Sequence, residues 1–244
     1  SKAADFLIAN NIQGNFFNDF NSGAFLVGRC FPSIKVFIDG RTEVYGSRFF
    51  EQHDLAWRGD EKIFKELTEK YQLTGAFLGT VYAPAPMRLV SHLFQNEDWA
   101  LVYFNYDALV FLRKVPANKE LIAKFRIDPA RLEVLRNDLA RIRLRNVEPY
   151  RNTNRAYSFF SMGLYDQALA EGYEALRVMP NNMEARKIIG QVFHRKGDYQ
   201  KAFEYLRAAK LLASGDLEVR YHLALTFEAQ NNFGQAAEQA KIVL

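Results

Sequence analysis

The stretches GLYDQALAEGYEALRVMPNN (residues 163–182) and GDYQKAFEYLRAAKLLASGD (residues 197–216) lie 34 residues apart and match each other column by column. Glycine, tyrosine and alanine recur in the same order in both, and a third, less regular copy follows at the same spacing. The chain from residue 149 therefore divides into the units 149–182, 183–216 and 217–244. A repeat of this length predicts a stack of helix pairs, in which each pair buries its apolar face against its neighbours.

The shared columns have a direct structural meaning. A small residue at the first column permits a tight turn between two helices, alanines allow the helices to approach closely, and aromatic residues fill the space between successive pairs. The first unit departs from the pattern, because polar residues 151–154 precede Ala156. The columns are Gly163, Gly197 and Asn231; Tyr165, Tyr199 and Phe233; Ala168, Ala202 and Ala236; Phe159, Phe193 and Phe227; and Ala175, Ala209 and Val243.

Over residues 149–244 these columns resemble the tetratricopeptide repeat. The resemblance implies an all-α stack that presents a concave surface to a protein or peptide, and it does not imply an enzyme. Each residue that would face this groove is equally compatible with an ordinary surface side chain. The candidate groove residues are Tyr157, Phe160, Lys187, Gln191, His194, Tyr221 and Glu228.

The last repeat ends in AKIVL, without a following polar helix. Leu225, Phe227, Ala236 and Val243 occupy core columns, so we expect the final helix pair to expose an apolar face. Either further repeats or a second copy of the chain would cover that face. The sequence therefore predicts either self-association through residues 217–244 or fraying of this end.

Residues 1–116 show a different pattern, in which apolar strand-like runs alternate with amphipathic helices. This order predicts an α/β domain with a mainly parallel sheet and an antiparallel edge hairpin. Residues 117–148 carry apolar side chains at helical spacing and predict a helical connector. This connector is expected to pack onto the first repeat, with the α/β domain as a second packing surface. We expect strands at 12–20, 34–40 (buried on both faces), 74–82, 99–105 and 108–114, and helices at 22–30 (capped by Asn21 or Ser22), 61–71 (capped by Asp60) and 88–95.

Polar side chains follow the first two strands. Asn18 and Asp19 come after the first, and the stretch VFIDGRTEVYG (residues 36–46) places Asp39, Arg41, Glu43 and Tyr45 after the second. Two interpretations remain open. Asp39 and Arg41 form an ion pair that ties loops together, or the six residues bind a small ligand such as a sugar beyond the carboxyl ends of the strands.

A second resemblance covers most of residues 4–114. The stretch NFFNDFNSGAFLVGRCFPSIKVFIDGRTEVYG and the later WALVYFNYDALVFLRK resemble the soluble extracytoplasmic domain of bacterial multi-pass membrane proteins related to glycosyltransferases. The resemblance implies a periplasmic or envelope location, a link to surface glycan assembly, and a catalytic site in membrane segments absent from this chain. Without that resemblance, a cytoplasmic location is the expectation. No catalytic residue is carried over.

The remaining chemistry is sparse. The chain lacks a glycine-rich phosphate loop, and its four histidines have no metal-ligand spacing, so we expect no catalytic residue, cofactor or metal. The run EQHD at 51–54 fits a solvated helix or loop better than a metal patch. Cys30 is the single cysteine, which excludes an internal disulfide. The net charge of +4 and the run RIRLRN at 141–146 favour a solvated helix face over a phosphate-binding patch, so no nucleic-acid partner is expected.

Overall fold

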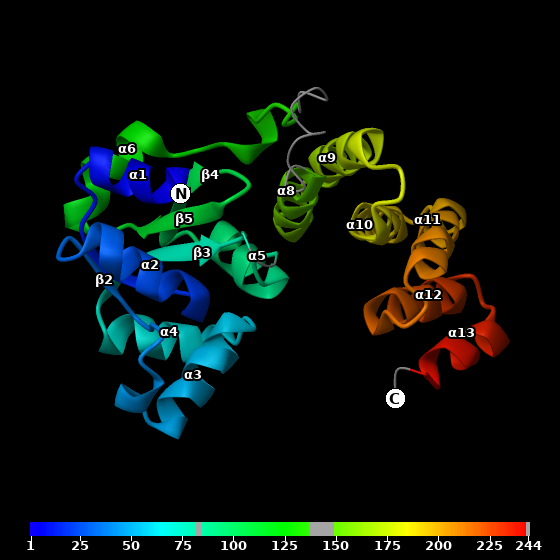
Figure 1. Cartoon of the computed structure of the whole chain (residues 1–244), viewed down its shortest axis with the longest axis horizontal. Helices are drawn as coiled ribbons and strands as arrows, with labels where there is room; N and C mark the ends of the chain where they lie inside the picture. Colours follow the sequence, from blue (N-terminus) through cyan, green and yellow to red (C-terminus); the bar gives the residue numbers. More distant parts are fainter. Residues whose placement is uncertain (82–83, 137–148, 243–244) are drawn as a thin grey trace. The chain divides into compact units, whose positions relative to one another are not determined.

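The computed structural model describes residues 1–81, 84–136 and 149–242, which form two compact units (Figure 1). The first comprises Ser1–Leu132 and Ser161–Gly163, and the second comprises Glu133–Phe160 and Leu164–Leu244. The first is an α/β unit and the second is helical, which confirms the predicted fold class. The predicted connector is divided between the units up to residue 136. Its remainder, including the run RIRLRN, lies outside the described residues.

The α/β unit is built on a five-stranded sheet with the order β2-β1-β3-β5-β4. The strands are β1 (Gly14–Asn18), β2 (Ile34–Val36), β3 (Leu73–Gly79), β4 (Trp99–Phe104) and β5 (Ala108–Arg113). β1 pairs in parallel with β2 and β3, while β5 pairs antiparallel with β3 and β4. Four strands therefore point one way and β5 alone is reversed. This is the mainly parallel sheet with an antiparallel edge hairpin that the sequence predicts.

Helices cover both faces of this sheet (Figure 1). Phe16 and Phe17, adjacent on β1, point to opposite faces because strand side chains alternate. Phe16 lies in a core with side chains of α1, α2 and α6, whereas the Phe17 ring contacts the rings of His53 in α3 and Phe64 in α4. The helices are α1 (Lys2–Ala9), α2 (Phe20–Cys30), α3 (Ser47–Trp57), α4 (Glu61–Lys70), α5 (Met87–Gln95) and α6 (Lys119–Phe125).

Two sequence-based expectations about the first strands are wrong. The cap of α2 is Asp19, whose carboxylate accepts a hydrogen bond from Ser22 N, and not Asn21 or Ser22. β2 is a three-residue edge strand with an exposed Lys35, and so is not buried on both faces. Just beyond β2, Phe37 N donates to Phe16 O and to the Asn18 side chain, which also donates to Ile38 O and so holds this segment at the end of β1. The cap by Asp60 on α4 is confirmed.

The second unit contains the predicted helix pairs. These are α8 (Pro149–Ser161) with α9 (Tyr165–Val178), α10 (Met183–Arg195) with α11 (Tyr199–Leu212), and α12 (Leu217–Ala229) with α13 (Phe233–Ala240). Gly163, Gly197 and Asn231 turn the chain within the pairs with φ of 77°, 80° and 58°. Only glycine adopts this left-handed conformation without strain, and asparagine tolerates it best among the others. The first column of the alignment is thereby explained.

Successive helices approach closely where side chains are small. Ala168 and Ala202 are fully buried. A Cβ added to Gly190 would lie 2.6 Å from Leu206 Cγ, so this glycine, outside the aligned columns, is also required for contact between α10 and α11. Across the described ranges of both units, we find no helix of the length and hydropathy needed to cross a membrane.

Candidate functional site

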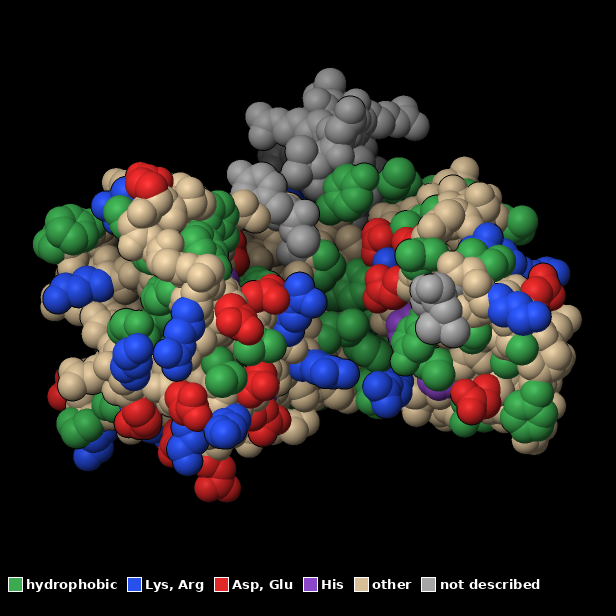
Figure 2. Space-filling model, turned by 90° about the horizontal axis from the view of Figure 1, so that it is seen from below, with side chains coloured by type: hydrophobic (Ala, Val, Ile, Leu, Met, Phe, Trp, Pro, Cys, Tyr) green, Lys and Arg blue, Asp and Glu red, His purple; other side chains and the backbone are tan. Residues whose placement is uncertain are grey.

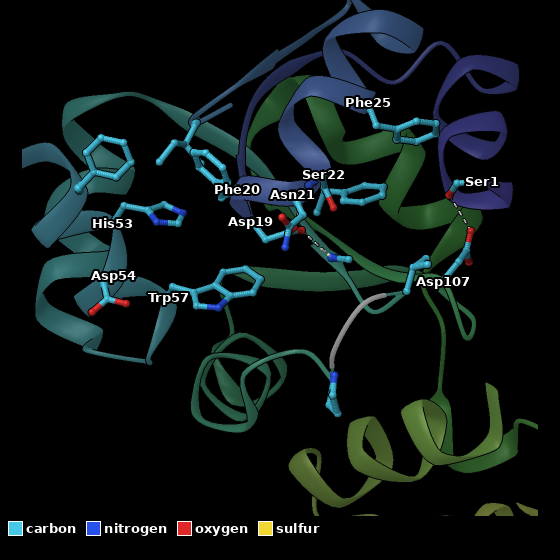
Figure 3. Close-up of a pocket in the computed structure, with 16 residues that line it drawn as sticks. Ser1, Asp19, Phe20, Asn21, Ser22, Phe25, His53, Asp54, Trp57 and Asp107 are labelled. Atoms are coloured by element: carbon cyan, nitrogen blue, oxygen red, sulfur yellow. Dashed lines mark hydrogen bonds between the residues drawn. The ribbon is translucent and has the colours of Figure 1, made fainter. Parts of the chain in front are cut away.

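The connections of the sheet single out one position at its edge. From β1 the chain passes through α2 to β2 on one side, and then crosses to β3 on the other side of β1. The carboxyl ends of β1 and β3 therefore flank the point where the winding reverses, which is where open α/β sheets bind ligands. A pocket with a volume of about 650 Å³ opens there (Figure 3). This volume is typical of small-molecule sites.

Asp19 lies at the centre of this edge. Its Oδ1 accepts a hydrogen bond from Ser22 N at 2.8 Å, and its Oδ2 accepts one from Gly79 N at 3.1 Å. One carboxylate therefore caps α2 and holds the end of β3 beside β1 (Figure 3). Because it occupies the N-terminus of α2, it compensates the positive end of the helix dipole, which would otherwise attract a bound anion.

His53 forms part of the pocket wall, although EQHD was expected to be a solvated segment. The residue is 8% exposed, and its Nε2 lies 3.0 Å from Asn18 O. Burial lowers the pKa of His53, so the ring is neutral at pH 7 and Nε2–H donates to that carbonyl. Its ring stacks on Trp57 with 6.2 Å between centroids. The segment is helical with Glu51 and Asp54 exposed, as expected, and His53 departs from the expectation because the aromatic side chains of α3 carry it into the core.

A second carboxylate closes another side of the pocket. Asp107, in the turn between β4 and β5, accepts hydrogen bonds from Ser1 Oγ at 2.7 Å, Ala3 N at 3.1 Å and Tyr103 Oη at 2.9 Å. Burial, together with the Asp107 charge, raises the pKa of Tyr103 well above its usual value. Tyr103 is therefore a hydrogen-bond donor at neutral pH, and not a candidate base.

The six residues predicted to bind a ligand separate in the structure. Asp19 is the one that lines this pocket, while the amide of Asn18 lies buried behind it. Asp39 is 2% exposed and binds Arg41 through the backbone N, Nε and Nη2, with the last contact at 2.5 Å. The Arg41 side chain is 66% exposed, and its hydrogen bonds hold the pKa of Asp39 below its usual value. Glu43 is exposed, and the Tyr45 ring stacks on that of Phe49.

The described residues offer no metal site, since no three of their His, Cys, Asp and Glu side chains gather in one place. Figure 2 shows acidic and basic side chains intermingled on the α/β unit, on the side of α3 and α4. That face therefore shows no basic surface suited to nucleic acid.

In the repeat unit, the predicted groove residues form a polar chain between the first helices of successive pairs. Tyr157 Oη donates to Glu184 at 2.6 Å, and Lys187 Nζ donates to Glu184 at 3.1 Å and to Glu218 at 2.7 Å. Gln191 also reaches Glu218, at 3.3 Å. Tyr157, Lys187 and Gln191 are buried, His194 and Phe160 are partly buried, and Tyr221 and Glu228 are exposed. Their role in partner binding stays a prediction.

The exposed members of this set line a groove between α12 and α13. It has a volume of about 370 Å³ and a mainly apolar wall. Phe233 and Tyr221, which flank it, are 63% and 50% exposed. The complete lining is Tyr221, Ala224, Leu225, Glu228, Phe233, Ala236, Ala237 and Ala240. Of the residues expected on the apolar face, Leu225 and Ala236 line this groove, whereas Phe227 is buried in the cluster with Leu206 of α11 and Val243 lies outside the described residues.

The opposite end of the repeat unit is polar. Arg155 Nε donates to Glu171 at 2.8 Å, and Asn152 Nδ2 donates to the other oxygen of Glu171 at 2.5 Å. These residues also bind the backbone of the preceding segment, because Arg155 donates to Glu133 O and Leu135 N donates to Glu171. The segment 133–136 is therefore bound to the first helix pair through its main chain.

Neither a family model nor a curated protein sequence matches the chain. A solved structure named "MamA AMB-1 P212121" is similar at 18% sequence identity and a TM-score of 0.36. The similarity covers 43% of this chain and 58% of that one, so it spans less than two thirds of the other structure. A likeness at this level adds nothing to the fold described above.

Proposed function

We propose that the chain is a non-catalytic binding module whose repeat unit docks an amphipathic helix of a protein partner. The observation that carries this proposal is the open groove between α12 and α13. The groove continues an interface that the stack already contains, because the equivalent groove of the preceding helix pair is filled by α12. The occupant of that inner groove indicates what the outer one accepts.

The 34-residue spacing makes the comparison direct. Lys187 and Gln191 of α10 are 5% and 1% exposed because they contact Glu218 of α12. Their equivalents in α12, Tyr221 and Leu225, line the open groove, and Tyr221 is 50% exposed. The second pair is thus covered at the columns where the third pair is open.

The helix that covers the inner groove presents apolar residues at every fourth position. Val219, Leu223 and Phe227 of α12 form one core cluster with Leu206 of α11. Residues four apart lie on one face of a helix. The proposed partner therefore carries apolar side chains at i, i+4 and i+8. Helix-in-groove docking of this kind is a common mode of peptide recognition.

The test uses a hydrocarbon-stapled helical peptide with the sequence of Leu217–Ala229, labelled for fluorescence anisotropy. Stapling is needed because a free helix of this length is marginal in water. We expect saturable binding to the chain, lost on Ala237→Arg in the groove wall and kept on Ala229→Arg, which is exposed on α12 outside the groove. A peptide with Leu223→Asp is the matched probe control. Equal binding of both peptides, or binding by the Ala237→Arg variant, would contradict the proposal.

The proposed setting of this module is the cell envelope, next to surface glycan assembly. Its support is the sequence resemblance over residues 4–114. The chain expressed from its complete gene should fractionate with membranes. In inverted membrane vesicles, whose cytosolic side faces outward, residues 1–242 should be protected from added protease. Recovery of the complete product in the soluble cytoplasmic fraction would reject this setting while leaving the helix groove unaffected.

A further inference from the structure

The pocket of the α/β unit combines flat aromatic walls with a set of oxygen acceptors. Phe20 and Phe25 reach it from α2, and Phe50 and Trp57 reach it from α3. Figure 3 shows Asp19, His53 and Trp57 around one space. Aromatic walls with a few convergent polar groups are the usual composition of a small-molecule site. None of these wall residues is needed for the helix groove, because that groove lies in the other unit.

The charge of the pocket excludes anionic ligands. Asp19, Asp54 and Asp107 contribute carboxylates, and no lysine or arginine is found among the described residues of its lining. His53 is neutral at pH 7. The N-terminus of α2, the place where this type of sheet usually holds phosphate, already binds the Asp19 carboxylate. A phosphate or carboxylate group would meet a net negative charge, because Arg58 offsets the charge of Asp54 alone.

The partners of the carboxylates distinguish the remaining ligand classes. Asp19 accepts from two backbone N–H groups, Asp107 accepts from Tyr103, Ser1 and Ala3, and Asp54 pairs with Arg58. All three carboxylates therefore already have hydrogen-bond or ion-pair partners, whereas an ammonium ligand is best bound by a carboxylate without them. Each carboxylate nevertheless has about four lone-pair directions and can accept a further hydroxyl hydrogen bond.

We infer that this pocket binds an uncharged sugar ring. The apolar C–H face of the ring stacks on Trp57 or Phe20, and a hydroxyl group at its rim donates to Asp19, which lies beside Trp57 and His53 (Figure 3). A wholly apolar ligand would cover these carboxylates without giving them hydrogen bonds, at a cost in desolvation. A sugar ring satisfies both kinds of wall at once. The inference is one of binding and includes no chemical step.

The experiment titrates the chain with the methyl glycosides of glucose, mannose, galactose and N-acetylglucosamine, followed by saturation-transfer NMR and calorimetry. Choline and inorganic phosphate are the probes for the cationic and anionic classes. We expect at least one glycoside to bind with a Kd on the order of 1 mM, and neither choline nor phosphate to bind. Absence of binding by every glycoside, or binding of choline or phosphate instead, would overturn the inference.

Four variants locate the ligand. At least one of the substitutions Trp57→Ala and Phe20→Ala should weaken glycoside binding about tenfold, since it removes the stacking surface. Phe20 is partly exposed, so its variant tests the site even where Trp57→Ala disturbs α3. Leu55→Ala, exposed on α3 outside the pocket, should leave binding unchanged. Asp54→Asn removes a charge and keeps an acceptor, so it should change binding by about twofold at most. Binding that survives both aromatic substitutions would place the sugar elsewhere.

Discussion

Arg155 and Glu171 form an ion pair inside the first helix pair of the repeat unit, with Nε and Oε1 2.8 Å apart and side chains 7% and 0% exposed. At the 34-residue spacing, the position of Arg155 is taken by Ile189 and Leu223, which are buried apolar residues. Ile189 in the second pair and Leu223 in the third each contact the preceding helix pair. In the first pair, the ion pair takes the place of that apolar contact and binds the segment 133–136 instead.

Removing one partner of this pair should be costly. Glu171→Leu leaves the Arg155 guanidinium buried without its carboxylate, and we expect the free energy of unfolding of the repeat unit to fall by about 3 kcal/mol or more. The double variant Arg155→Ile/Glu171→Leu should recover part of this loss, because an apolar pair needs no compensation. Urea unfolding followed by circular dichroism measures both. A double variant that is as unstable as the sum of the single variants would show that the two residues do not act as a pair.

The pair between Asp39 and Arg41 should contribute less than a fully buried pair would. Asp39→Ala leaves behind an arginine whose side chain is 66% exposed and hydrated, so we expect a loss of about 1–2 kcal/mol. The folded-state pKa of Asp39 is lowered, so the contribution is present above pH 3.8 and is lost as the pH falls through the folded pKa.

Thermal melts at steps of roughly one pH unit between about pH 2 and pH 7 check this prediction. Arg41→Lys is the matched control, since it keeps the charge and loses the paired N–H groups. A melting temperature that Asp39→Ala leaves unchanged at pH 7 would instead support the ligand-binding interpretation of this cluster.

The repeat unit should lose stability in mild acid through His222. Burial lowers the pKa of His222 from 6.5 to about 4, against the opposing effect of the Glu218 carboxylate. The unfolded chain therefore binds a proton between about pH 6.5 and pH 4 that the folded chain does not, so stability falls as the pH falls through this window. One such group contributes a slope of about 1.4 kcal/mol per pH unit. His222→Gln should reduce the pH dependence of the free energy of unfolding in this range. An unaltered slope would show that His222 is not the group responsible.

Two glycines of α2 should respond in opposite directions to the same substitution. A Cβ on Gly23 would lie 2.0 Å from Ile38 O, which is backbone and has little freedom to move, so Gly23→Ala should destabilise the α/β unit strongly. Gly28 has open space around it, and Gly28→Ala should stabilise the same helix by up to about 1 kcal/mol. Differential scanning calorimetry of both variants provides the comparison. Equal effects would mean that α2 does not pack against the chain after β2 as described.

Self-association through the last helix pair is the prediction that competes with a partner helix. In the absence of a partner, we expect sedimentation velocity to show a concentration-dependent dimer, because two open grooves can cover each other. Ala237→Asp should abolish the dimer, and Ala229→Asp, outside the groove, should not. A sedimentation coefficient that is independent of concentration would show that the groove does not pair with itself.

The repeat unit could be predicted well because its period fixes several features at once. The column of Gly163, Gly197 and Asn231 marks the turns, and the caps Asn182, Asp198 and Asp216 follow from preferred residue types. What could not be predicted is how polar residues of α10 pair. Lys187 and Gln191 resemble surface residues, and they become buried because Glu184 and Glu218, which occupy one column, supply their partners.

The pocket of the α/β unit was harder to predict. Its location at the ends of the strands follows from the alternation of strands and helices, and Asp19 follows from its position after β1. His53 was missed because its immediate neighbours are polar, although aromatic residues at 49, 50 and 57 share its face of α3. That periodicity is the signal that would have found it. The choice of Asp19 over Asn21 and Ser22 as the N-cap depends on where β1 ends. The sequence does not decide it, because all three residue types are favourable N-caps.

The polar end formed by Arg155 and Glu171 limits the symmetry of any assembly of this chain. A head-to-tail contact would bring the groove between α12 and α13 against a helix pair that the segment 133–136 already covers, so an open-ended filament is disfavoured. Groove against groove is an isologous contact, and it closes after two copies about a two-fold axis. Among the described residues, the repeat unit therefore offers its open groove at the last helix pair and a covered surface at the first.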